Sequence, residues 1–371
     1  MNIGVIKDPK QGESRVGMTP ENVNRLVQSG NKVFVEKNAG LGSGFPDNLY
    51  EEVGAMIVDT KDAWNVDLVV KVKEPMKEEF KYFKEDLIIW GFLHLAASKE
   101  VVEAMVNAKV TAISGENISI DGVLELLKPM SAIAGRRAVN LGQYYLEKEH
   151  GGEGILLPGI DGIDPGVVVI LGGGNAAENS ADMALGINCK VYILELNEQR
   201  IEYLENRYKG KNIEIISSTT ENLEKYIQVA DVFISTILIP GAKPPKIVKE
   251  YMVKTMKPGS VIVDIAIDQG GTVETIESPT SHQDPIFEKH GVIHYAVPNM
   301  PGATPRTSTI ALAQGNISYL LGISENGLED AITSVKGLAS GISIYKGHIT
   351  QQGIADSSGY SYYELEALIN E

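Results

Sequence analysis

The stretch Val167–Glu195, VVVILGGGNAAENSADMALGINCKVYILE, decides the fold predicted for this chain. Five apolar residues run into three consecutive glycines, a segment of helical character follows, and a second apolar run ends at Glu195. A strand, a tight turn, a helix and a second strand in this order form a βαβ unit. The turn matches the pattern G-x-G-x-x-A at Gly172, Gly174 and Ala177, which is typical of dinucleotide-binding units.

Each position of this pattern has a physical reason. Gly172 permits a turn that is too tight for a side chain, and Gly174 lets the backbone approach a pyrophosphate. Ala177 keeps the helix close to the sheet, and the N–H groups at the helix start bind the anion. Glu195, about 20 residues further on, can accept hydrogen bonds from an adenosine ribose. The alternative is a structural turn in an α/β domain that binds nothing.

Length and composition limit the kind of protein. A chain of 371 residues with 43% hydrophobic residues can fill two domain cores. The net charge of -16 argues against nucleic acid or an anionic membrane surface as a partner. No apolar run is long enough for a transmembrane helix, and the N-terminus lacks the features of a secretory signal. Cys189 is the single cysteine and no His/Cys cluster has metal-ligand spacing, so we expect a cytoplasmic protein without a metal.

Strands and helices alternate through the N-terminal third of the chain. Thr19, a hydroxyl N-cap before Pro20, predicts a helix start, and we interpret the glycine-rich segment Gly40–Asp47 as structural. Such alternation implies parallel pairing with right-handed crossovers. It predicts a first domain over 1–128, with strands at Asn2–Lys7, Lys32–Glu36, Asp67–Val72, Leu87–Leu93 and Val110–Ser114.

A second α/β domain is expected over 129–304. Pro129–Glu147 has helical spacing, and Lys246–Met256 predicts another helix. The remaining segment, 305–371, is too short for a domain and is expected to return to the first one. The predicted fold is α/β, with two Rossmann-type domains of mostly parallel, doubly wound sheets and a cleft between them. The strands expected in the second domain are Val167–Leu171, Val191–Leu194, Ile213–Ile216, Asp231–Ile237, Ser260–Ala266 and Ile293–Val297.

In open parallel sheets, ligands bind beyond the carboxyl ends of the strands, and this rule selects candidate residues. In the first domain, Lys73 and Glu74 follow one expected strand and His94 closes another. In the second domain, Asp268 and Asn299 each follow a strand. If the two domains face each other across a cleft, these groups converge on a nicotinamide ring.

Each candidate also has a simpler interpretation. His94 could be a hydrogen-bonded core histidine, Lys73 a solvated charge at a strand end, and Arg15 a surface charge. Asp268 precedes a Gly-Gly turn and could satisfy its own backbone. Only the coincidence of several candidates at strand ends, beside a nucleotide unit, favours a functional role. The other five histidines lie in polar or turn-rich contexts, which predicts surface or loop positions for His150, His282, His290, His294 and His348.

At these same residues the sequence resembles the alanine dehydrogenase family over nearly its whole length. The membrane-coupled nicotinamide nucleotide transhydrogenase subunit is similar in fold, but it does not combine the motif AIDQGG with the motif NMPGATPRTST. The matching blocks are ESRVGMTP (Glu13–Pro20), GSGFPD (Gly42–Asp47), VKVKEP (Val70–Pro75), LHLAA (Leu93–Ala97), LIPGAKPPK (Leu238–Lys246), MKPGSVIVDIAIDQGG (Met256–Gly271) and NMPGATPRTST (Asn299–Thr309).

The resemblance implies an activity and a set of roles. The family oxidises L-alanine with NAD to pyruvate, ammonia and NADH, and runs the reverse amination. Arg15 and Lys73 match its substrate-binding positions, and an arginine fork suits a carboxylate. His94 and Asp268 match its catalytic pair, because protons must move when water attacks the iminium left by hydride transfer. Glu74 is expected to support Lys73.

The cofactor implied is NAD. The Glu195 carboxylate would repel the 2′-phosphate of NADP and therefore favours NAD, although Arg200 nearby could soften this repulsion. Besides the glycine turn, the resemblance brings in further cofactor-binding positions: Ser131, Arg200, Ser218, Ile237, Leu238, Ile267, Asp268, Val297, Asn299 and Met300.

The resemblance also implies a homo-oligomer, a hexamer, that acts on small molecules. From its charge and its lack of long apolar runs, we expect neither nucleic acid nor a membrane as partner. Because the dinucleotide unit holds only half of the expected active site, closure of the two domains is expected as part of the mechanism. Two alternatives stay open. One is a transhydrogenase-type subunit that moves hydride between two nucleotides, and the other is a non-catalytic NAD-binding module.

Overall fold

The computed structural model describes residues 1–237 and 244–370 and divides the chain into two compact units. Unit 1 comprises residues 1–130 and 302–371, and unit 2 comprises residues 131–301. Unit 1 is therefore discontinuous in sequence. The boundaries expected from the sequence, after residues 128 and 304, fall within a few residues of these divisions. None of the described helices is long and apolar enough to cross a membrane.

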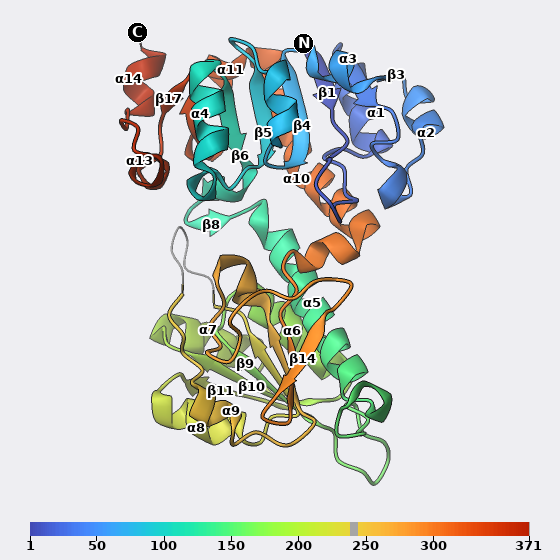
Figure 1. Ribbon diagram of the computed structural model, residues 1–371, viewed down its shortest axis with the longest axis vertical. Coiled ribbons are helices and arrows are strands. Elements are labelled where there is room, and N and C mark those ends of the chain that lie inside the picture. Colours follow the sequence, from blue (N-terminus) through green and yellow to red (C-terminus); the bar gives the residue numbers. More distant parts are fainter. Residues whose placement is uncertain (238–243, 371) are drawn as a thin grey trace. The chain divides into compact units, whose positions relative to one another are not determined.

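Unit 1 is built on a mixed sheet whose central part is parallel (Figure 1). Its strand order is β17-β16-β6-β5-β4-β1-β2-β3, and β1 to β6 pair in parallel while β16 and β17 add antiparallel strands at one edge. The two antiparallel strands come from the C-terminal segment. The strands are β1 (Asn2–Val5), β2 (Lys32–Glu36), β3 (Met56–Val58), β4 (Leu68–Lys73), β5 (Ile88–Phe92), β6 (Thr111–Ser114), β16 (Ile342–Tyr345) and β17 (His348–Ile349).

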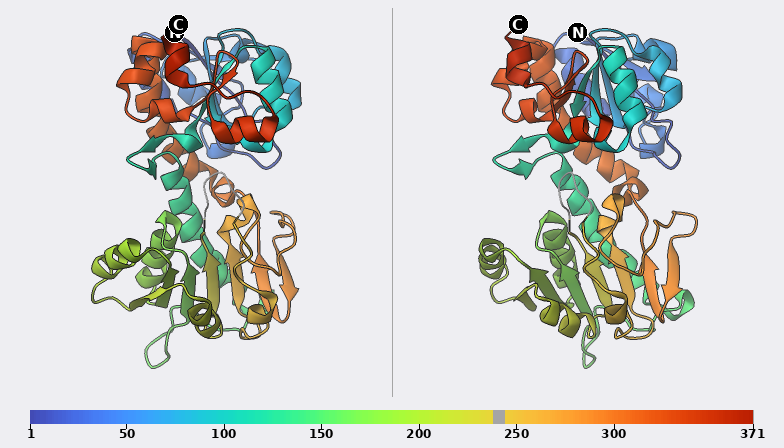
Figure 2. Two further views of the ribbon diagram at one scale, coloured as in Figure 1. Left: turned by 90° about the vertical axis from the view of Figure 1, so that its left-hand side faces the viewer. Right: turned by 60° about the vertical axis from the view of Figure 1, so that its left-hand side comes forward.

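Helices cover both faces of this sheet, as the views in Figure 2 show. Ile89 packs into a core with α3, α4 and α13, whereas the ring of its neighbour Trp90 lies 5.6 Å from that of Tyr319 on α10. Successive strand residues point to opposite faces, so α10 lies on the other face. The helices are α1 (Pro20–Gln28), α2 (Asp47–Glu51), α3 (Thr60–Trp64), α4 (Lys99–Asn107), α10 (Pro305–Asn326), α11 (Leu328–Ser334), α12 (Leu338–Gly341), α13 (Gln352–Ser358) and α14 (Leu365–Ile369); β7 (Ser119–Ile120) and β8 (Val123–Leu124) form a separate hairpin.

Unit 2 contains the second doubly wound sheet, with the order β11-β10-β9-β12-β13-β15-β14. All neighbours are parallel except β14 and β15. The chain order reverses between β9 and β12, the position where such sheets bind their ligands. The strands are β9 (Val167–Leu171), β10 (Lys190–Glu195), β11 (Ile213–Ser217), β12 (Val232–Ser235), β13 (Val261–Asp264), β14 (Ile286–Lys289) and β15 (Val292–Tyr295).

The apolar run of β9 is divided between two cores. Val168 and Ile170 pack with α5, α6 and α7, whereas Val169 and Leu171 pack with α8 and α9 on the other face. This division explains why the run lacks alternation, since a central parallel strand is buried on both sides. The helices are α5 (Leu127–Tyr145), which begins in unit 1, α6 (Asn175–Gly186), α7 (Glu198–Arg207), α8 (Thr220–Ile227) and α9 (Glu250–Val253). The α/β fold class with mostly parallel sheets in two domains is thus confirmed.

One expected helix is much shorter than predicted. Lys246–Met256 contains only the single turn of α9, because the residues before it run extended beside another segment. The backbone N–H groups of Ile247 and Val248 donate to the Thr272 carbonyl, at 2.8 and 3.1 Å. The strands β3, β14, β16 and β17 and the hairpin of β7 and β8 were not expected. β3, β14 and β17 lie at sheet edges and β16 lies beside one, and this pairing depends on contacts that no local pattern reveals.

The surface position predicted for His294 is wrong. This residue is fully buried in β15, where its ring stacks on Phe287 at 4.8 Å. Nε2 lies 2.8 Å from the Thr275 hydroxyl, and Nδ1 lies 2.9 Å from the Val292 carbonyl. Both ring nitrogens have hydrogen-bond partners, which is what a buried histidine requires. Burial lowers the pKa of His294 to about 4.

The His294 pKa predicts a loss of stability in acid. In the unfolded chain His294 is protonated below about pH 6.5, whereas in the folded chain it is protonated only below about pH 4. Stability therefore falls as the pH drops through this window, by roughly 3 kcal/mol for this group. The unfolding free energy, measured with urea at pH 7, 6 and 5, should fall less steeply with decreasing pH for His294→Phe than for the unmodified chain. The exposed His348→Gln is the control; an equal slope in both variants would contradict the prediction.

Candidate active site

The glycine turn of unit 2 has the geometry of a dinucleotide-binding turn. Gly172 has φ 97°, and a Cβ atom there would lie 2.8 Å from the Thr236 hydroxyl oxygen. Gly174 is the N-cap of α6, and a Cβ atom there would meet nothing within 4 Å. Ala177 is fully buried against the sheet. The turn therefore leaves open space over a helix N-terminus, where a pyrophosphate fits.

Residues after β9 and β12 flank the reversal of strand order. Ile237 is half-buried just beyond β12, and its neighbour Thr236 donates to the Leu171 carbonyl at 2.9 Å. This bond ties the segment after β12 to the end of β9. Leu238, also named from the sequence, lies outside the described residues.

The carboxylate of Glu195 lies at the end of β10, beside the glycine turn. Its Oε1 accepts hydrogen bonds from the N–H groups of Leu196 and Asn197, at 2.8 and 2.9 Å. Its Oε2 lies close to Gly173, since a Cβ atom built there would be 2.6 Å from it. The carboxylate thus shapes the start of the next loop while lying next to the turn.

Arg200 is held beside the turn by two partners. Its Nε donates to the Gly173 carbonyl at 2.6 Å, and its guanidinium pairs with Glu178 in the first turn of α6. Glu178 also lies 3.3 Å from Nε of Arg207. The two arginines therefore balance the carboxylate that stands near the helix N-terminus.

The AIDQGG segment forms the short 3-10 helix Ile265–Gln269 after β13. The fully buried Asp264 accepts hydrogen bonds from the N–H groups of Ala266 and Thr272, at 3.0 and 2.9 Å. Burial outweighs these bonds and raises the pKa of Asp264. Asp268 is exposed, and its Oδ1 accepts from the Asn299 N–H at 2.8 Å. Asp268 and Asn299, far apart in sequence, are thus brought together.

The other cofactor positions named from the sequence differ in burial. The side chains of Ile267, Val297 and Met300 are buried in the two cores of unit 2, so these residues can offer a ligand mainly their backbone. Ser218 is half-buried, and its N–H donates to the Glu195 carbonyl at 2.8 Å. Ser131 is half-buried on α5.

In unit 1, Arg15 is buried in the loop that follows β1. Its Nε and a terminal nitrogen donate to the two oxygens of Glu13, at 2.7 and 2.5 Å, while the other terminal nitrogen lies 3.6 Å from Sδ of Met130. Burial raises the pKa of Glu13, but the hydrogen bonds and charge of Arg15 outweigh it and leave the pKa below its ordinary value. The simpler interpretation of Arg15 as a surface charge is therefore wrong.

The segments GSGFPD and PRTST hold the Arg15 loop in place. Thr309 on α10 is fully buried; its hydroxyl accepts from the Val16 N–H at 3.0 Å and lies 2.7 Å from the Ser43 hydroxyl. Arg306 donates to the Gly44 carbonyl at 2.8 Å and lies 4.5 Å from the ring of Phe45. The structural interpretation of Gly40–Asp47 agrees with these contacts.

Lys73 lies at the end of β4, and Asp8 fixes its backbone. The Lys73 N–H donates to Oδ2 of Asp8 at 2.8 Å. Glu74 pairs with Lys10 at 2.5 Å, so two interactions tie the loop after β1 to the end of β4. Burial raises the pKa of Glu74, but the opposite effects of Lys10 and then Lys73 are larger in sum and leave the pKa below its ordinary value. The carboxylate is therefore ionised at neutral pH.

Beneath these residues lies a buried ion pair that the sequence did not suggest. Lys71 is 1% exposed, and its Nζ lies 2.8 Å from Glu79 and 3.8 Å from Asp8. The lysine thus balances two carboxylates inside the unit.

His94 follows β5 with a left-handed backbone, at φ 44°. Its side chain is 46% exposed, which argues against the alternative of a core histidine. The partial burial of the ring, and next the positive charge of Lys73, lower the pKa of His94 to about 4. Glu74 opposes this effect, while Lys10 and Arg15 add to it. The imidazole is therefore neutral at pH 7, and these charged residues lie close enough to act on it.

Glu116 is a residue that the sequence analysis missed. It follows β6 and accepts hydrogen bonds from the N–H groups of Leu93 and His94, at 3.1 and 2.6 Å. Burial raises the pKa of Glu116 to about 7, although these N–H groups favour the ionised form. The strand-end rule could have found Glu116, because it follows the next strand of the same sheet.

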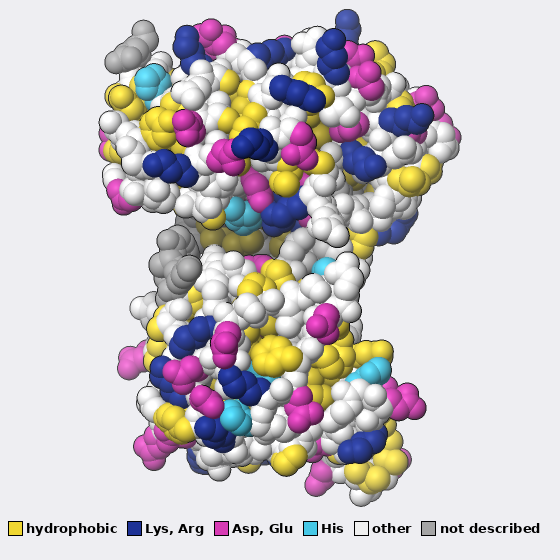
Figure 3. Space-filling view, in the orientation of Figure 1, with side chains coloured by type: hydrophobic (Ala, Val, Ile, Leu, Met, Phe, Trp, Pro, Cys, Tyr) yellow, Lys and Arg dark blue, Asp and Glu magenta, His cyan; other side chains and the backbone are white. Residues whose placement is uncertain are grey.

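The described chain contains no group of three or more His, Cys, Asp or Glu residues arranged to hold a metal ion. On the face drawn in Figure 3, acidic and basic side chains are interspersed over each unit.

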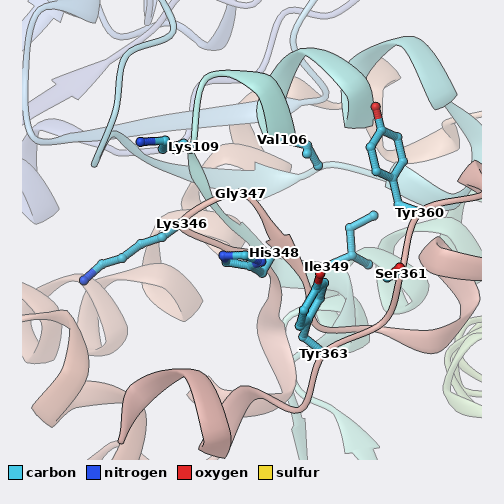
Figure 4. Close-up of a pocket in the computed structure, with 9 residues that line it drawn as sticks. All are labelled: Val106, Lys109, Lys346, Gly347, His348, Ile349, Tyr360, Ser361 and Tyr363. Carbon is cyan, nitrogen blue, oxygen red and sulfur yellow. The ribbon is translucent and has the colours of Figure 1, made fainter. Parts of the chain in front are cut away.

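A cavity of about 350 Å³ lies at the edge of unit 1, away from these residues. Figure 4 shows Lys109 and Lys346 on one side and Tyr360 and Tyr363 on the other. Lys109 pairs with Glu85 at 2.7 Å and Lys346 with Glu329 at 2.9 Å. None of the site residues named from the sequence, as far as the structure describes them, lines this cavity.

The fold and the turn define a class of protein. Two doubly wound α/β units, with a glycine turn and an acidic residue beside the reversal of strand order, are the architecture of two-domain dinucleotide-binding proteins. The chain belongs to the alanine dehydrogenase/PNT family: residues 4–134 match the model of its N-terminal domain and residues 138–352 that of its C-terminal domain.

Individual relatives are similar over the whole chain. "Alanine dehydrogenase 1" of Staphylococcus aureus is 58% identical over 368 residues, which cover 98% of this chain and 99% of that protein. A solved structure titled L-alanine dehydrogenase is 42% identical, covers 96% of this chain and 99% of its own, and superposes with a TM-score of 0.92. A transhydrogenase from Sinorhizobium meliloti, 24% identical over 95% of this chain and 99% of its own, shares the fold with a TM-score of 0.82.

The contacts of Thr309 predict a stability effect that can be measured by urea unfolding. Thr309→Val removes the hydroxyl that pairs with the buried Val16 N–H and with Ser43. An unsatisfied buried donor costs about 1–3 kcal/mol, so the unfolding free energy should fall by about that amount. The exposed Thr333→Val on α11 is the control and should change it little. Equal unfolding free energies of the two variants would show that the Thr309 hydrogen bonds do not stabilise the fold.

Proposed function

We propose that this chain is an NAD-dependent L-alanine dehydrogenase, which oxidises L-alanine to pyruvate and ammonia and catalyses the reverse reductive amination. One observation carries the proposal. Arg15, Lys73 and His94 gather at the carboxyl edge of the unit 1 sheet, where the positive charges of Lys73 and Arg15 lie close enough to lower the pKa of His94. Unit 2 supplies the dinucleotide turn in the same chain. Membership of the family supports the same reaction.

Unit 1 is proposed to bind the substrate. The Arg15 guanidinium, already oriented by the Glu13 fork, attracts the carboxylate of alanine or pyruvate. Lys73 holds the keto or imino region, and its backbone is fixed by Asp8. Glu74, paired with Lys10, keeps the local charge balanced beside Lys73.

His94 and Asp268 are proposed as the catalytic pair. NAD bound at unit 2 would supply the acceptor for the hydride that leaves Cα of alanine. Water then adds to the resulting iminium carbon, and ammonia leaves as pyruvate forms. A neutral imidazole can take the proton from the attacking water, and the carboxylate of Asp268 can orient or assist this transfer. The reaction therefore needs residues of both units, and we propose that the units close on each other during turnover.

Unit 2 is proposed to bind NAD at the glycine turn. The N–H groups at the start of α6 would hold the pyrophosphate, and Glu195 would accept from the adenosine ribose. The Arg200 charge is already shared with Glu178, which supports NAD over NADP. The further residues proposed for this site are Gly172, Gly174, Ala177, Arg200, Ser131, Ser218, Ile237, Leu238, Ile267, Asp268, Val297, Asn299 and Met300.

We further propose that the chain assembles as a homohexamer and works in the cytoplasm. Family resemblance supports the assembly, and the single cysteine, Cys189, suits a reducing compartment. Light scattering of the purified protein measures the number of subunits directly.

The activity is tested by NADH oxidation in the presence of pyruvate and ammonium. We expect turnover with NADH, much weaker turnover with NADPH, and none when ammonium is omitted. No turnover with pyruvate under either cofactor would rule out the alanine assignment. Hydride transfer from NADH to an NADP analogue without substrate would favour a transhydrogenase-type subunit, and NAD-dependent assembly without turnover a non-catalytic module.

The role of His94 gives a second prediction. His94→Ala should lower kcat by a factor of at least ~100, because it removes the group proposed to move the proton. NADH affinity, measured by fluorescence titration, should stay unchanged because the cofactor site is assigned to unit 2. If the variant loses NADH binding as well, His94 has a structural role.

The two glycines of the turn should respond differently to substitution. Gly174→Ala has an allowed backbone and meets no atom, so the variant should fold normally. Its methyl group should nevertheless weaken NADH binding at least ~10-fold, because it occupies the space proposed for the pyrophosphate. Gly172→Ala should instead lower the unfolding free energy by roughly 1–3 kcal/mol, because φ is positive and Thr236 is in the way. Unchanged NADH affinity in Gly174→Ala would contradict the proposed site.

A further inference from the structure

We propose that Glu116 is a positioning residue for His94, whose carboxylate holds the His94 backbone in its left-handed conformation and orients the imidazole. This inference rests on the proposed function and adds to it a residue that does not touch the substrate. The carboxylate is buried, with 9% of the residue exposed, and comes from a different strand end than His94.

The left-handed backbone of His94 needs groups that stabilise it. A φ of 44° is uncommon for a residue with a side chain and costs free energy unless surrounding groups stabilise it. Leu93, the preceding residue, is fully buried, so its N–H also needs a partner. A single group that accepts from both N–H groups can hold this turn.

Glu116 is that group. Oε2 accepts from the Leu93 N–H at 3.1 Å and Oε1 from the His94 N–H at 2.6 Å. The two oxygens thus bind the N–H groups of two consecutive residues. Bonds between an N–H group and a carboxylate are among the stronger hydrogen bonds in proteins. An amide side chain of the same size could offer only one oxygen and would turn an N–H₂ group toward the other donor.

The same carboxylate also acts on the ring. Nδ1 of His94 lies 3.8 Å from Oε1, which makes it the ring nitrogen associated with Glu116. A nearby carboxylate favours a proton on the nitrogen that faces it. Nε2 is then the nitrogen that can accept a proton from water at the substrate. At 3.8 Å the carboxylate makes no hydrogen bond with the ring, so it directs the imidazole through the backbone that it holds, and its charge favours one tautomer.

The charge of the surroundings is consistent with this role. Burial raises the pKa of the Glu116 carboxyl to about 7, although the backbone N–H groups that bind it, and after them the charge of Lys73, favour the ionised form. The Glu116 carboxyl therefore changes charge near neutral pH, whereas His94 has a pKa of about 4. An ionisation seen near neutral pH in the kinetics should follow Glu116.

The test compares Glu116→Gln and Glu116→Asp in the full-length protein. Glu116→Gln should lower kcat for reductive amination about 10- to 100-fold, because small displacements of a catalytic group have effects of this size. The NADH dissociation constant should remain within about twofold. The neutral-range inflection of the kcat/KM profile should disappear. Glu116→Asp keeps a carboxylate that is too short to reach both N–H groups, so it should give an intermediate kcat and retain an inflection.

Glu79→Gln is the matched control, since Glu79 is also a buried carboxylate of unit 1 that accepts a backbone N–H, from Met76 at 2.7 Å. It should lower stability but leave the neutral-range inflection in place. If Glu116→Gln keeps kcat within about twofold and an unchanged profile, or if it loses NADH affinity in parallel with kcat, the proposal is wrong. If Glu116→Gln does not fold, an unchanged kcat in Glu116→Asp overturns it.

Failure of the proposed function would look different. In that case the unmodified chain itself would not turn over pyruvate with ammonium. A crystal structure of Glu116→Gln would then decide the positioning role alone. His94 leaving the left-handed region would support it, and an unchanged φ would overturn it.

Discussion

Burial of the central strands on both faces is the constraint from which the rest of the structure follows. The side chains of β9 point alternately into two separate cores, so helices must cover both faces of the sheet. Parallel neighbours then require crossover connections, and every loop that follows a strand emerges at the same edge. The glycine turn, the AIDQGG segment and the Asn299 turn lie at that edge in unit 2, and Lys73, His94 and Glu116 lie at the corresponding edge in unit 1.

Carboxylates shape the backbone at both edges. Asp8 accepts from the N–H of Lys73, Glu116 from that of His94, and Asp268 from that of Asn299. Asp264 and Glu195 do the same for the loops that follow β13 and β10. Loops at strand ends leave N–H groups without partners in the sheet, and a carboxylate oxygen satisfies them strongly. Part of the chain's negative charge therefore has a local structural purpose.

Charge pairing prepares the two edges for different tasks. In unit 1, the pair Arg15–Glu13 fixes a guanidinium fork, while nearby positive charge helps to keep His94 neutral. In unit 2, Arg200 and Arg207 balance Glu178, which reduces the negative charge facing the start of α6. Both arrangements are made by contacts within the chain, so the cost of ordering these side chains is met during folding.

The sequence by itself determined the fold class and the chemistry of the turns. Apolar runs separated by helical segments require a parallel sheet, and the glycine pattern at Gly172 requires a sharp turn whatever surrounds it. The strand-end rule also selected Lys73, His94 and Asp268. Only the tertiary structure decided which partners these residues meet. Thr309 holds the Val16 N–H across 293 positions of sequence, Glu116 reaches His94 from the next strand, and the His294 ring stacks on Phe287 of the neighbouring strand β14. Such contacts depend on how strands are ordered in space, and local periodicity carries no information about that order.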